Sequence, residues 1–600
     1  MNLRPLVLSL AVTACQDYDF HKAVDVPEGE DTACALGIDT GWVAPDPGCV
    51  VEPEVGTFNP VIEWQWNASG AFPGYDDIMA TPVVGNLSDD NGDGRIDADD
   101  IPDIVFTTFA GGGYTAAGTL TALSGDGTGE LWSLLDAGGV AFYASGTPAI
   151  GDLDGDGLPE VCVGAVGGGV VCVTNEGAFR WQGGTSTTID GAPAIADIDG
   201  DGQAEVVWGY QLLDTDGTLL WTGAGGSGWI LSFAVDLDAD GVLEIIAGNT
   251  AYNADGSIRW QDGTGDGPGA VGDFDLDGVP EIVHVVGGPV VTGADGIVWW
   301  SAAMPGGGGG PPTVADFDGD GYPEIGIAGA YSYTVFDTDG SVLWSASVQD
   351  YSSSVTGSSV FDFEGDGAAD VVYGDEVTLW VYDGATGAVK FQMDDHASGT
   401  LLEYPLIVDV DNDGSTEIVV ASNNYAFTGW NGITVIGDAD QSWRPSRPIW
   451  NQYAYFITNV NDDGSIPTYQ EPNWTRYNNF RAGGTTLGLS NELADLQALT
   501  PNVCLTQCNG GAAQITVPIR NVGLADSVEF VVEIYASSGG AALGRASLSL
   551  RAGEQRDVGP FLFTADQWSG ALYARIDDAD VVEECDEADN ILGLGEWPCE

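Results

Sequence analysis

One nine-residue pattern recurs along the middle of this chain and constrains its fold more than any other feature. The copy that begins at Asp152 reads Asp-Leu-Asp-Gly-Asp-Gly-Leu-Pro-Glu, with carboxylates at positions 1, 3, 5 and 9 and glycine at position 6. Alternate side chains of such a loop can surround a hard cation, the glycine permits a sharp turn, and the carbonyl of position 7 adds a ligand. The spacing therefore predicts a loop that binds a divalent cation.

The pattern occurs in seven regular copies, and an expanded copy precedes them. An ordinary turn also favours Asp and Gly, but it needs no acid at position 9, which every regular copy carries. We therefore expect several bound Ca²⁺ ions, since Mg²⁺ tolerates flexible multi-carboxylate loops poorly. The predicted ligands of the regular copies are Asp152, Asp154, Asp156 and Glu160; Asp197, Asp199, Asp201 and Glu205; Asp236, Asp238, Asp240 and Glu244; Asp273, Asp275, Asp277 and Glu281; Asp316, Asp318, Asp320 and Glu324; Asp362, Glu364, Asp366 and Asp370; and Asp409, Asp411, Asp413 and Glu417. Those of the expanded copy are Asp89, Asn91, Asp93, Asp97 and Asp100.

The regular spacing of the copies predicts a repeat fold. They begin at residues 152, 197, 236, 273, 316, 362 and 409. In each unit an apolar strand enters the acidic loop, a β-branched strand leaves it, and two more short strands follow. Four antiparallel strands in about 40 residues are typical of a propeller blade. We predict an all-β chain with an eight-bladed propeller, or a seven-bladed one if the expanded unit belongs to a cap.

Aromatic residues at one place in each unit are predicted to pack between blades and not to bind ligand. They are Trp132, Trp181, Trp221, Trp260, Trp300, Trp344 and Phe391. Trp64 and Trp66 form a similar fourth strand before the first loop, and residues 433–436 form a third strand after the last. Joining the two ends in one blade would leave no exposed sheet edge.

The acidic loop followed by a β-branched strand resembles the FG-GAP and VCBS repeats of integrin-α-like propellers over residues 58–443, and this resemblance implies calcium in the loops. Glu364 departs from that pattern with a longer acid at position 3. Residues 89–100 resemble a 12-residue EF-hand or dockerin loop.

Residues 490–600 alternate in short strands that favour a small immunoglobulin-like β-sandwich. Arg520-Asn521-Val522-Gly523 and the stretch from Asp577 to Asn590 resemble the bacterial cell-adhesion-related domain, CARDB. The cysteines at 504, 508 and 585 are additions to that pattern.

The N-terminus is predicted to be a signal. Residues 1–14 hold Arg4, an apolar run and small residues, which is typical of a secretory signal peptide. Val12-Thr13-Ala14-Cys15 resembles the lipobox of bacterial lipoproteins, which implies a lipid anchor on Cys15; an ordinary signal peptide with a chance cysteine is the alternative. Residues 15–57 are expected to form an acidic tether. The chain is therefore expected to be exported and lipid-anchored at the bacterial outer membrane or cell surface, with no spanning helix.

Without Cys15, eight cysteines remain, which suits four disulfides in an oxidising compartment. Cys162 and Cys172 flank Gly167–Gly169, so a hairpin would place them opposite one another. Cys34 and Cys49 are expected to close a loop in the tether. The remaining four allow three pairings: Cys504, Cys508, Cys585 and Cys599.

Residues 444–489 break the repeat and are predicted to be a connecting segment. They hold four of the 15 basic residues, Arg444, Arg447, Arg476 and Arg481. In a chain with 91 acidic residues, we expect these arginines to pair with carboxylates of the propeller or the sandwich; a ligand-binding role is the alternative. The net charge of −76 excludes nucleic acid and anionic lipid as partners.

The metal loops join first and second strands, so they should share one face of the propeller. The loops of the opposite face are variable and rich in Gly, Ser and Thr, as recognition loops on a rigid scaffold often are. They comprise residues 182–191, 222–232, 302–312, 347–358 and 394–404, with the aromatic residues Trp229, Tyr351 and Tyr404. We predict a non-catalytic, calcium-stabilised surface adhesion protein that binds an extracellular protein or polysaccharide through this face.

The alternative is a secreted polysaccharide lyase or hydrolase, which would need an acid/base group outside the repeat. The three histidines are His21 in the tether, His284 in a strand and His396 within Asp394-Asp395-His396. The last cluster is the one catalytic candidate, although its composition favours a solvated loop.

Overall fold

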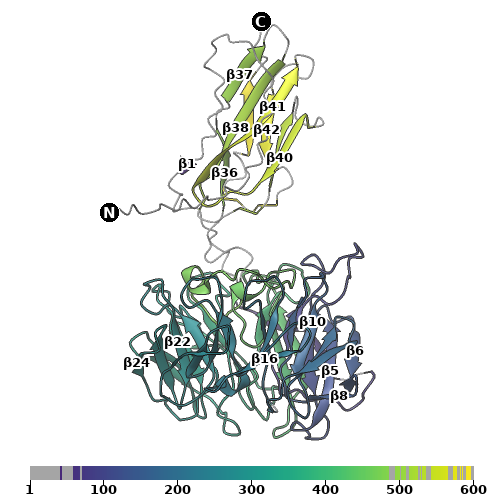
Figure 1. Cartoon of the computed structure of the whole chain (residues 1–600), viewed down its shortest axis with the longest axis vertical. Helices are drawn as coiled ribbons and strands as arrows, with labels where there is room; N and C mark the ends of the chain where they lie inside the picture. The colour runs from purple at the N-terminus through teal and green to yellow at the C-terminus, as the bar shows by residue number, and fades with distance from the viewer. Residues whose placement is uncertain are drawn as a thin grey trace, which may run out of the picture. The chain divides into compact units, whose positions relative to one another are not determined.

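The computed structural model (Figure 1) describes residues 41–42, 58–67, 70–188, 190–484, 494–499, 502–507, 512–523, 527–528, 530–535, 542–564, 572–577, 581–582, 584–585 and 590–595. It divides into two compact units, residues 48–493 and residues 1–47 with 494–600. Regular structure in these ranges is all-β apart from short 3-10 turns such as η2 (Gly228–Ile230). The predicted signal peptide, Cys15 and the predicted pair Cys34–Cys49 lie outside the described residues.

The larger unit is a β-propeller, as the repeat predicts. Within residues 60–438 the described strands form eight four-stranded antiparallel blades, and two short strands extend the first. The expanded first unit is therefore a blade and not a cap. Blade by blade, the strands are β3 (Val83–Gly85), β4 (Asp103–Thr108), β5 (Ala117–Ser124) and β6 (Glu130–Leu134), with β7 (Asp136–Ala137) and β8 (Val140–Tyr143); β9 (Ala149–Gly151), β10 (Glu160–Gly164), β11 (Val170–Thr174) and β12 (Phe179–Gly183); β13 (Ala194–Ala196), β14 (Glu205–Trp208), β15 (Gln211–Leu213) and β16 (Leu219–Thr222); β17 (Phe233–Val235), β18 (Glu244–Ala247), β19 (Thr250–Tyr252) and β20 (Ile258–Gln261); β21 (Gly269–Gly272), β22 (Glu281–Val285), β23 (Pro289–Gly293) and β24 (Val298–Ser301); β25 (Thr313–Ala315), β26 (Glu324–Ala328), β27 (Ser332–Phe336) and β28 (Val342–Ser347); β29 (Ser359–Phe361), β30 (Asp370–Gly374), β31 (Leu379–Tyr382) and β32 (Val389–Met393); and β33 (Leu406–Val408), β34 (Glu417–Ser422), β35 (Gly432–Asp438) and β2 (Pro60–Trp66).

The last blade closes the ring by joining the two ends of the repeat region. Strand β2 pairs with β35, so that Trp64 lies opposite Val435 and Trp66 opposite Ile433. This confirms the predicted closure. The pairing gives β35 a neighbour on both sides. Without β2, β35 would be the exposed outer edge of its blade.

Aromatic residues of the fourth strands pack between blades, as predicted. The Trp221 indole Nε1 donates to the carbonyl of Ala254 in the next blade at 2.8 Å. Gly256, in the same turn, has φ +80°, and a Cβ there would lie 2.6 Å from the Trp221 ring. The same ring-on-glycine arrangement recurs around the propeller, in the pairs Trp64–Gly127, Trp132–Gly177, Trp181–Gly217, Trp260–Gly296, Trp300–Gly340 and Trp344–Gly387.

The first strands of neighbouring blades contact one another and so line the axis of the ring. Residues 444–484 lie against these strands. Val84 and Trp450 exchange two backbone hydrogen bonds of 2.8 and 2.9 Å, and Val314 and Phe480 exchange two of 3.1 and 2.8 Å. A first strand has no neighbour on its axial side within its own blade, and unpaired backbone groups are costly when buried. The segment therefore acts as a central plug, which we define as residues 444–484.

The arginines of the plug are held in different ways. Arg444 pairs with Asp362 of the propeller at 3.3 Å, as expected. Arg447 pairs with Asp462 of the plug itself at 2.6 Å. Arg481 is fully buried and donates to two propeller carbonyls, at 3.3 and 2.6 Å. The expectation of carboxylate partners in the propeller or sandwich thus holds for Arg444 and is wrong for Arg447 and, among the described residues, for Arg481 and for Arg476, which lies over the Tyr477 ring.

The smaller unit is a β-sandwich. One sheet has the order β1 (Gly41–Trp42), β41 (Glu554–Thr564), β38 (Ala512–Asn521) and β36 (Leu496–Ala498), with β37 (Asn502–Gln507) also paired to β38. The other has the order β40 (Gly544–Leu548), β39 (Phe530–Tyr535), β42 (Leu572–Ile576) and β43 (Ile591–Gly595). Strand β1 comes from the predicted tether, so the propeller is inserted in the chain between two strands of the sandwich.

Candidate metal centres

The aspartate at position 1 shapes each acidic loop. Oδ1 of Asp152 accepts the N–H groups of Gly155 and Asp156, at 2.8 and 3.2 Å, and Oδ2 accepts that of Gly157 at 2.9 Å. Gly157 has φ +83°, a conformation that glycine adopts without strain. The contacts of Oδ1 with position 5 and of Oδ2 with position 6 recur in the other regular loops.

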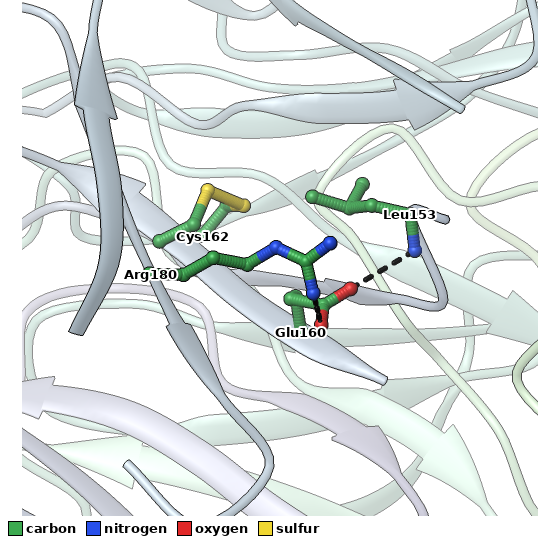
Figure 2. The surroundings of a disulfide bond; sticks show 5 residues. Leu153, Glu160, Cys162 and Arg180 are labelled. Carbon is green, nitrogen blue, oxygen red and sulfur yellow. Dashed lines mark hydrogen bonds and ion pairs between the residues drawn. A yellow bond between two sulfur atoms is a disulfide. The ribbon is translucent and has the colours of Figure 1, made fainter. Parts of the chain in front are cut away.

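The acid at position 9 begins the second strand and is buried. Glu160 is 2% exposed, and its Oε2 accepts the N–H of Leu153 at 3.0 Å (Figure 2). The corresponding bond to position 2 recurs in five other loops, at 2.8 to 3.0 Å. It turns the buried carboxylate toward the other acids of the loop.

The structure brings the predicted ligands together. In each of five loops, three carboxylates have oxygens within 4.8 Å of one another; these groups are Asp152, Asp154 and Asp156; Asp197, Asp199 and Glu205; Asp236, Asp238 and Glu244; Asp273, Asp275 and Glu281; and Asp316, Asp318 and Asp320. Such an all-oxygen donor set, part buried and part exposed, suits a hard divalent cation.

The electrostatics of the loops also fit a cation. Burial, reinforced by the neighbouring aspartates, raises the pKa of Glu281 and Glu324 to about 8. The same causes raise the pKa of Glu417 to about 10 and that of Asp409 to about 7. Carboxylates that repel one another in a partly desolvated site gain most from a bound positive charge.

The first blade has a register that the sequence did not reveal. Asp103 begins β4 as Glu160 begins β10, and it accepts the N–H of Leu87 at 2.8 Å, the contact between positions 2 and 9. Asn86 therefore takes position 1, and residues 89–100 are an insertion. Oδ1 of both Asn86 and Asp103 is buried without a hydrogen-bond partner among the described residues, which leaves each oxygen able to accept a ligand such as a cation. The overlooked signal was an acid at the start of the second strand.

The insertion itself closes like an independent loop. Asp89 accepts the N–H groups of Gly92 and Gly94, at 2.7 and 2.9 Å, as position 1 does in the regular loops. Asp100 is 1% exposed and accepts the N–H groups of Asp90 and Asn91, at 2.9 and 3.1 Å. The carboxylate at position 12 thus folds back onto the start of the loop, as the EF-hand resemblance implies.

Three regular loops contain a basic side chain that sequence reasoning missed. Arg180 pairs with Asp154 at 2.5 Å. It also pairs with Glu160, as Figure 2 shows. Arg259 makes the equivalent pairs with Asp238 and Glu244, at 2.7 and 2.9 Å. Lys390 pairs with Asp370 at 2.7 Å and with Glu364.

A disulfide lies beside the first of these loops. Cys162 and Cys172 are directly opposite in β10 and β11 and are bonded, as predicted (Figure 2). Cys585 is also in a disulfide. The side chains of the other cysteines lie outside the described residues, so their predicted pairings stay predictions.

The opposite face displays aromatic side chains. Trp229 is 38% exposed, and its backbone has φ +59°. Tyr351 is 56% exposed and lies 4.9 Å from Tyr331, ring centre to ring centre. Tyr404 is buried and donates to the carbonyl of Tyr453, so the prediction that it is displayed is wrong.

The candidate catalytic histidine is also buried. His396 is 4% exposed, and its Nδ1 lies 2.9 Å from Oγ of Ser422. Burial lowers its pKa to about 4. Asp394 and Asp395 are exposed, as expected of a solvated loop, whereas His396 itself is buried, so that expectation is wrong for the histidine. His284 is likewise fully buried, 2.8 Å from Oγ1 of Thr264.

Comparisons with known proteins agree with this architecture. Residues 152–208 match the model of the FG-GAP-like repeat, and residues 494–593 match that of the CARDB domain. The chain therefore combines FG-GAP-like repeats with a CARDB domain. No curated protein matches the chain.

One solved structure shares the fold, and a second aligns less well. The Vibrio cholerae biofilm matrix protein Bap1 is 24% identical and has a TM-score of 0.65, over 72% of this chain and all of that one. The exotype rhamnogalacturonan lyase YesX is 14% identical with a TM-score of 0.46, over 72% of this chain and 82% of that one. Among the residues that the structure describes, no helix has the length and apolar character needed to cross a membrane.

Proposed function

We propose that the chain is an exported, calcium-stabilised binding protein that works in adhesion and is not an enzyme. Calcium occupies the acidic loops and stiffens one face of the propeller. The loops of the opposite face bind an extracellular protein or polysaccharide. Lipid on Cys15 attaches the mature chain to the outer membrane or cell surface.

The observation that carries this proposal is the set of exposed aromatic rings on the face opposite the acidic loops. The strained turn at Trp229 is held by a partly buried contact, because Asp266 accepts the N–H groups of Ser227 and Gly228 at 3.0 Å each. Strain that is fixed by surrounding contacts is often found at functional sites. Rigid, exposed rings suit stacking on sugars or docking on protein, at low entropic cost.

Further support comes from the loops and from the fold. The all-oxygen donor sets and their repelling carboxylates suit calcium better than magnesium. The disulfide between Cys162 and Cys172 suits an oxidising, extracytoplasmic compartment. A biofilm matrix protein shares the propeller fold, and a role outside the cell agrees with that likeness.

The test is a glycan and protein binding array with the purified mature chain, in millimolar calcium and in chelator. We expect saturable binding that needs calcium, and about a tenfold loss of affinity in Trp229→Ala or Tyr351→Ala. The control is Tyr322→Ala, since Tyr322 is 44% exposed but belongs to an acidic loop on the other face. An equal loss in the control would overturn the assignment of the binding face, and depolymerisation of a polysaccharide would favour the enzyme.

A further inference from the structure

A β-bulge recurs at one place in the fourth strand of every blade. In the third blade, Leu212 lies opposite Trp221 and Leu213 opposite Leu219, so that Leu220 has no partner. The same offset occurs one residue before the aromatic position in each of the other blades. We call this the bulge residue; around the ring it is Leu131, Arg180, Leu220, Arg259, Trp299, Leu343, Lys390 and Glu63.

The bulge aims this side chain at the acidic loop of its own blade. A bulge rotates a side chain away from the regular alternation of a strand. Arg180, Arg259 and Lys390 show where it points, because each reaches both the position 9 carboxylate and the one at position 3. A basic bulge residue therefore places its own positive charge beside the carboxylates that would otherwise bind a metal ion.

Apolar bulge residues leave the loop without an internal cation. Leu220, Trp299 and Leu343 belong to the blades whose loops begin at Asp197, Asp273 and Asp316. Within the described part of the chain, no ion pair reaches these three loops. Their carboxylates face one another with hydrogen bonds but no opposite charge.

The blade that closes the ring has an acidic bulge residue. Its bulge residue is Glu63, in β2, beside the loop that begins at Asp409. Glu63 holds the same bulge position from which Arg180, Arg259 and Lys390 reach their own loops. This loop thus has a fifth carboxylate, which comes from the opposite end of the repeat region. The Asp362 loop is the reverse case, because both Lys390 and Arg444 enter it.

We infer that the bulge residue grades the calcium affinity of the loops. The order, from tightest to weakest, is the Asp409 loop with its added glutamate; the Asp197, Asp273 and Asp316 loops with apolar bulge residues; and the Asp152, Asp236 and Asp362 loops, where calcium must compete with arginine or lysine. Calcium affinity follows the net charge of the ligand set, and charges a few ångströms apart interact strongly in a partly buried site. This inference rests on the proposal that the loops bind calcium.

A consequence concerns the protein at low calcium. Blades with a basic bulge residue hold their loops together with an internal ion pair, so they need the metal least. Blades with an apolar or acidic bulge residue depend on calcium to offset repulsion. The ring should therefore load in stages as calcium rises, and the tight sites, including the one that joins the two ends, should fill first.

The experiment exchanges bulge residues between the second and third blades in the full mature chain. We expect Arg180→Leu to raise the affinity of one calcium site about tenfold and Leu220→Arg to lower that of one site by a similar factor, in calorimetric titration of the chelator-stripped protein. In chelator, Leu220→Arg should raise the melting temperature and Arg180→Leu should lower it. Arg180→Lys keeps the charge and is the matched control.

A second variant keeps the test informative if either exchange of a bulge residue impairs folding. Glu63→Gln removes a charge without changing shape, and it should weaken the tightest class of site while leaving the others unchanged. If the wild-type chain binds no calcium, the proposed function fails. If it binds calcium but neither exchange nor Glu63→Gln alters any affinity in the stated direction, the graded affinity is overturned while the calcium proposal stands.

Discussion

At the scale of residues, each acidic loop balances hydrogen bonds from the backbone against repulsion between its carboxylates. The carboxylate at position 1 uses both oxygens to accept backbone N–H groups, so it fixes the loop before any ion binds. The acid at position 9 is buried at the start of a strand and has one bond to the backbone. Its charge must be offset by a proton, by a basic side chain or by a metal ion.

This balance predicts an unusual dependence of stability on pH. In chelator, we expect the melting temperature of the propeller to fall as pH rises from about 5 to about 8. The reason is that Glu281 and Glu324, with a pKa of about 8 in the folded chain and an ordinary value of 4.5, hold protons that the unfolded chain has already released. In calcium the metal replaces the proton, and the fall should disappear. A melting temperature that rises with pH in chelator would contradict this account.

At the scale of elements, each blade is fitted to the next by an aromatic ring that covers a glycine turn. The ring closes the gap between two sheets, and its indole N–H donates to a carbonyl of the turn, as Trp221 does to Ala254. Only a residue without a side chain leaves room for the ring, and a positive φ suits glycine for a second reason. The recurrence of tryptophan in the fourth strand and of glycine in the following blade thus has a single cause.

Alanine substitutions at two glycines near one strand would separate the effect of backbone conformation from that of contact with the Trp221 ring. Gly256 and Gly263 both have φ +80°, but a Cβ at Gly263 meets no atom within 4 Å. We expect Gly263→Ala to cost about 1 kcal/mol of unfolding free energy for its left-handed backbone. Gly256→Ala should cost about 1–3 kcal/mol more, because the Trp221 ring must move. Urea denaturation in calcium measures both, and equal losses would show that the ring yields without cost.

At the scale of the whole molecule, two long-range connections hold the ring together. Strand β2 joins the start of the repeat region to its end, and the plug satisfies the axial edges of the first strands. The plug follows the last blade directly in sequence, so the chain turns back from that blade to the first strands of the ring. With a net charge of −76, the chain needs these connections to oppose the repulsion among its blades.

The plug should therefore contribute strongly to stability. Trp450 is fully buried, stacks on Tyr455 with 4.5 Å between ring centres, and exchanges backbone bonds with β3. We expect Trp450→Ala to lower the unfolding free energy by about 3–5 kcal/mol, because it leaves a large cavity on the axis. Tyr469→Ala, at an exposed position of the same segment, is the control and should cost little. Equal stability of the two variants in denaturant would mean that the Trp450 side chain does not anchor the plug.

The sequence by itself determined the features that are local along the chain. The period of the acidic loops predicts the blades, the spacing within one loop brings its carboxylates together, and a short hairpin places Cys162 opposite Cys172. Even the ring closure was predictable, because β2 carries the pattern of a fourth strand that lacks its own blade.

Only the tertiary structure decided what depends on residues far apart in sequence. The role of Asp103 depends on strand register across an insertion, and the path of the plug depends on the unpaired edges that the closed ring presents. The burial of His396 and Tyr404 depends on how neighbouring loops pack. Arg180 and Glu63 enter loops through a bulge that forms only when the third and fourth strands pair. Short-range spacing fixes which groups meet within a turn, whereas a charge or an aromatic ring acquires its partner from the assembled sheet.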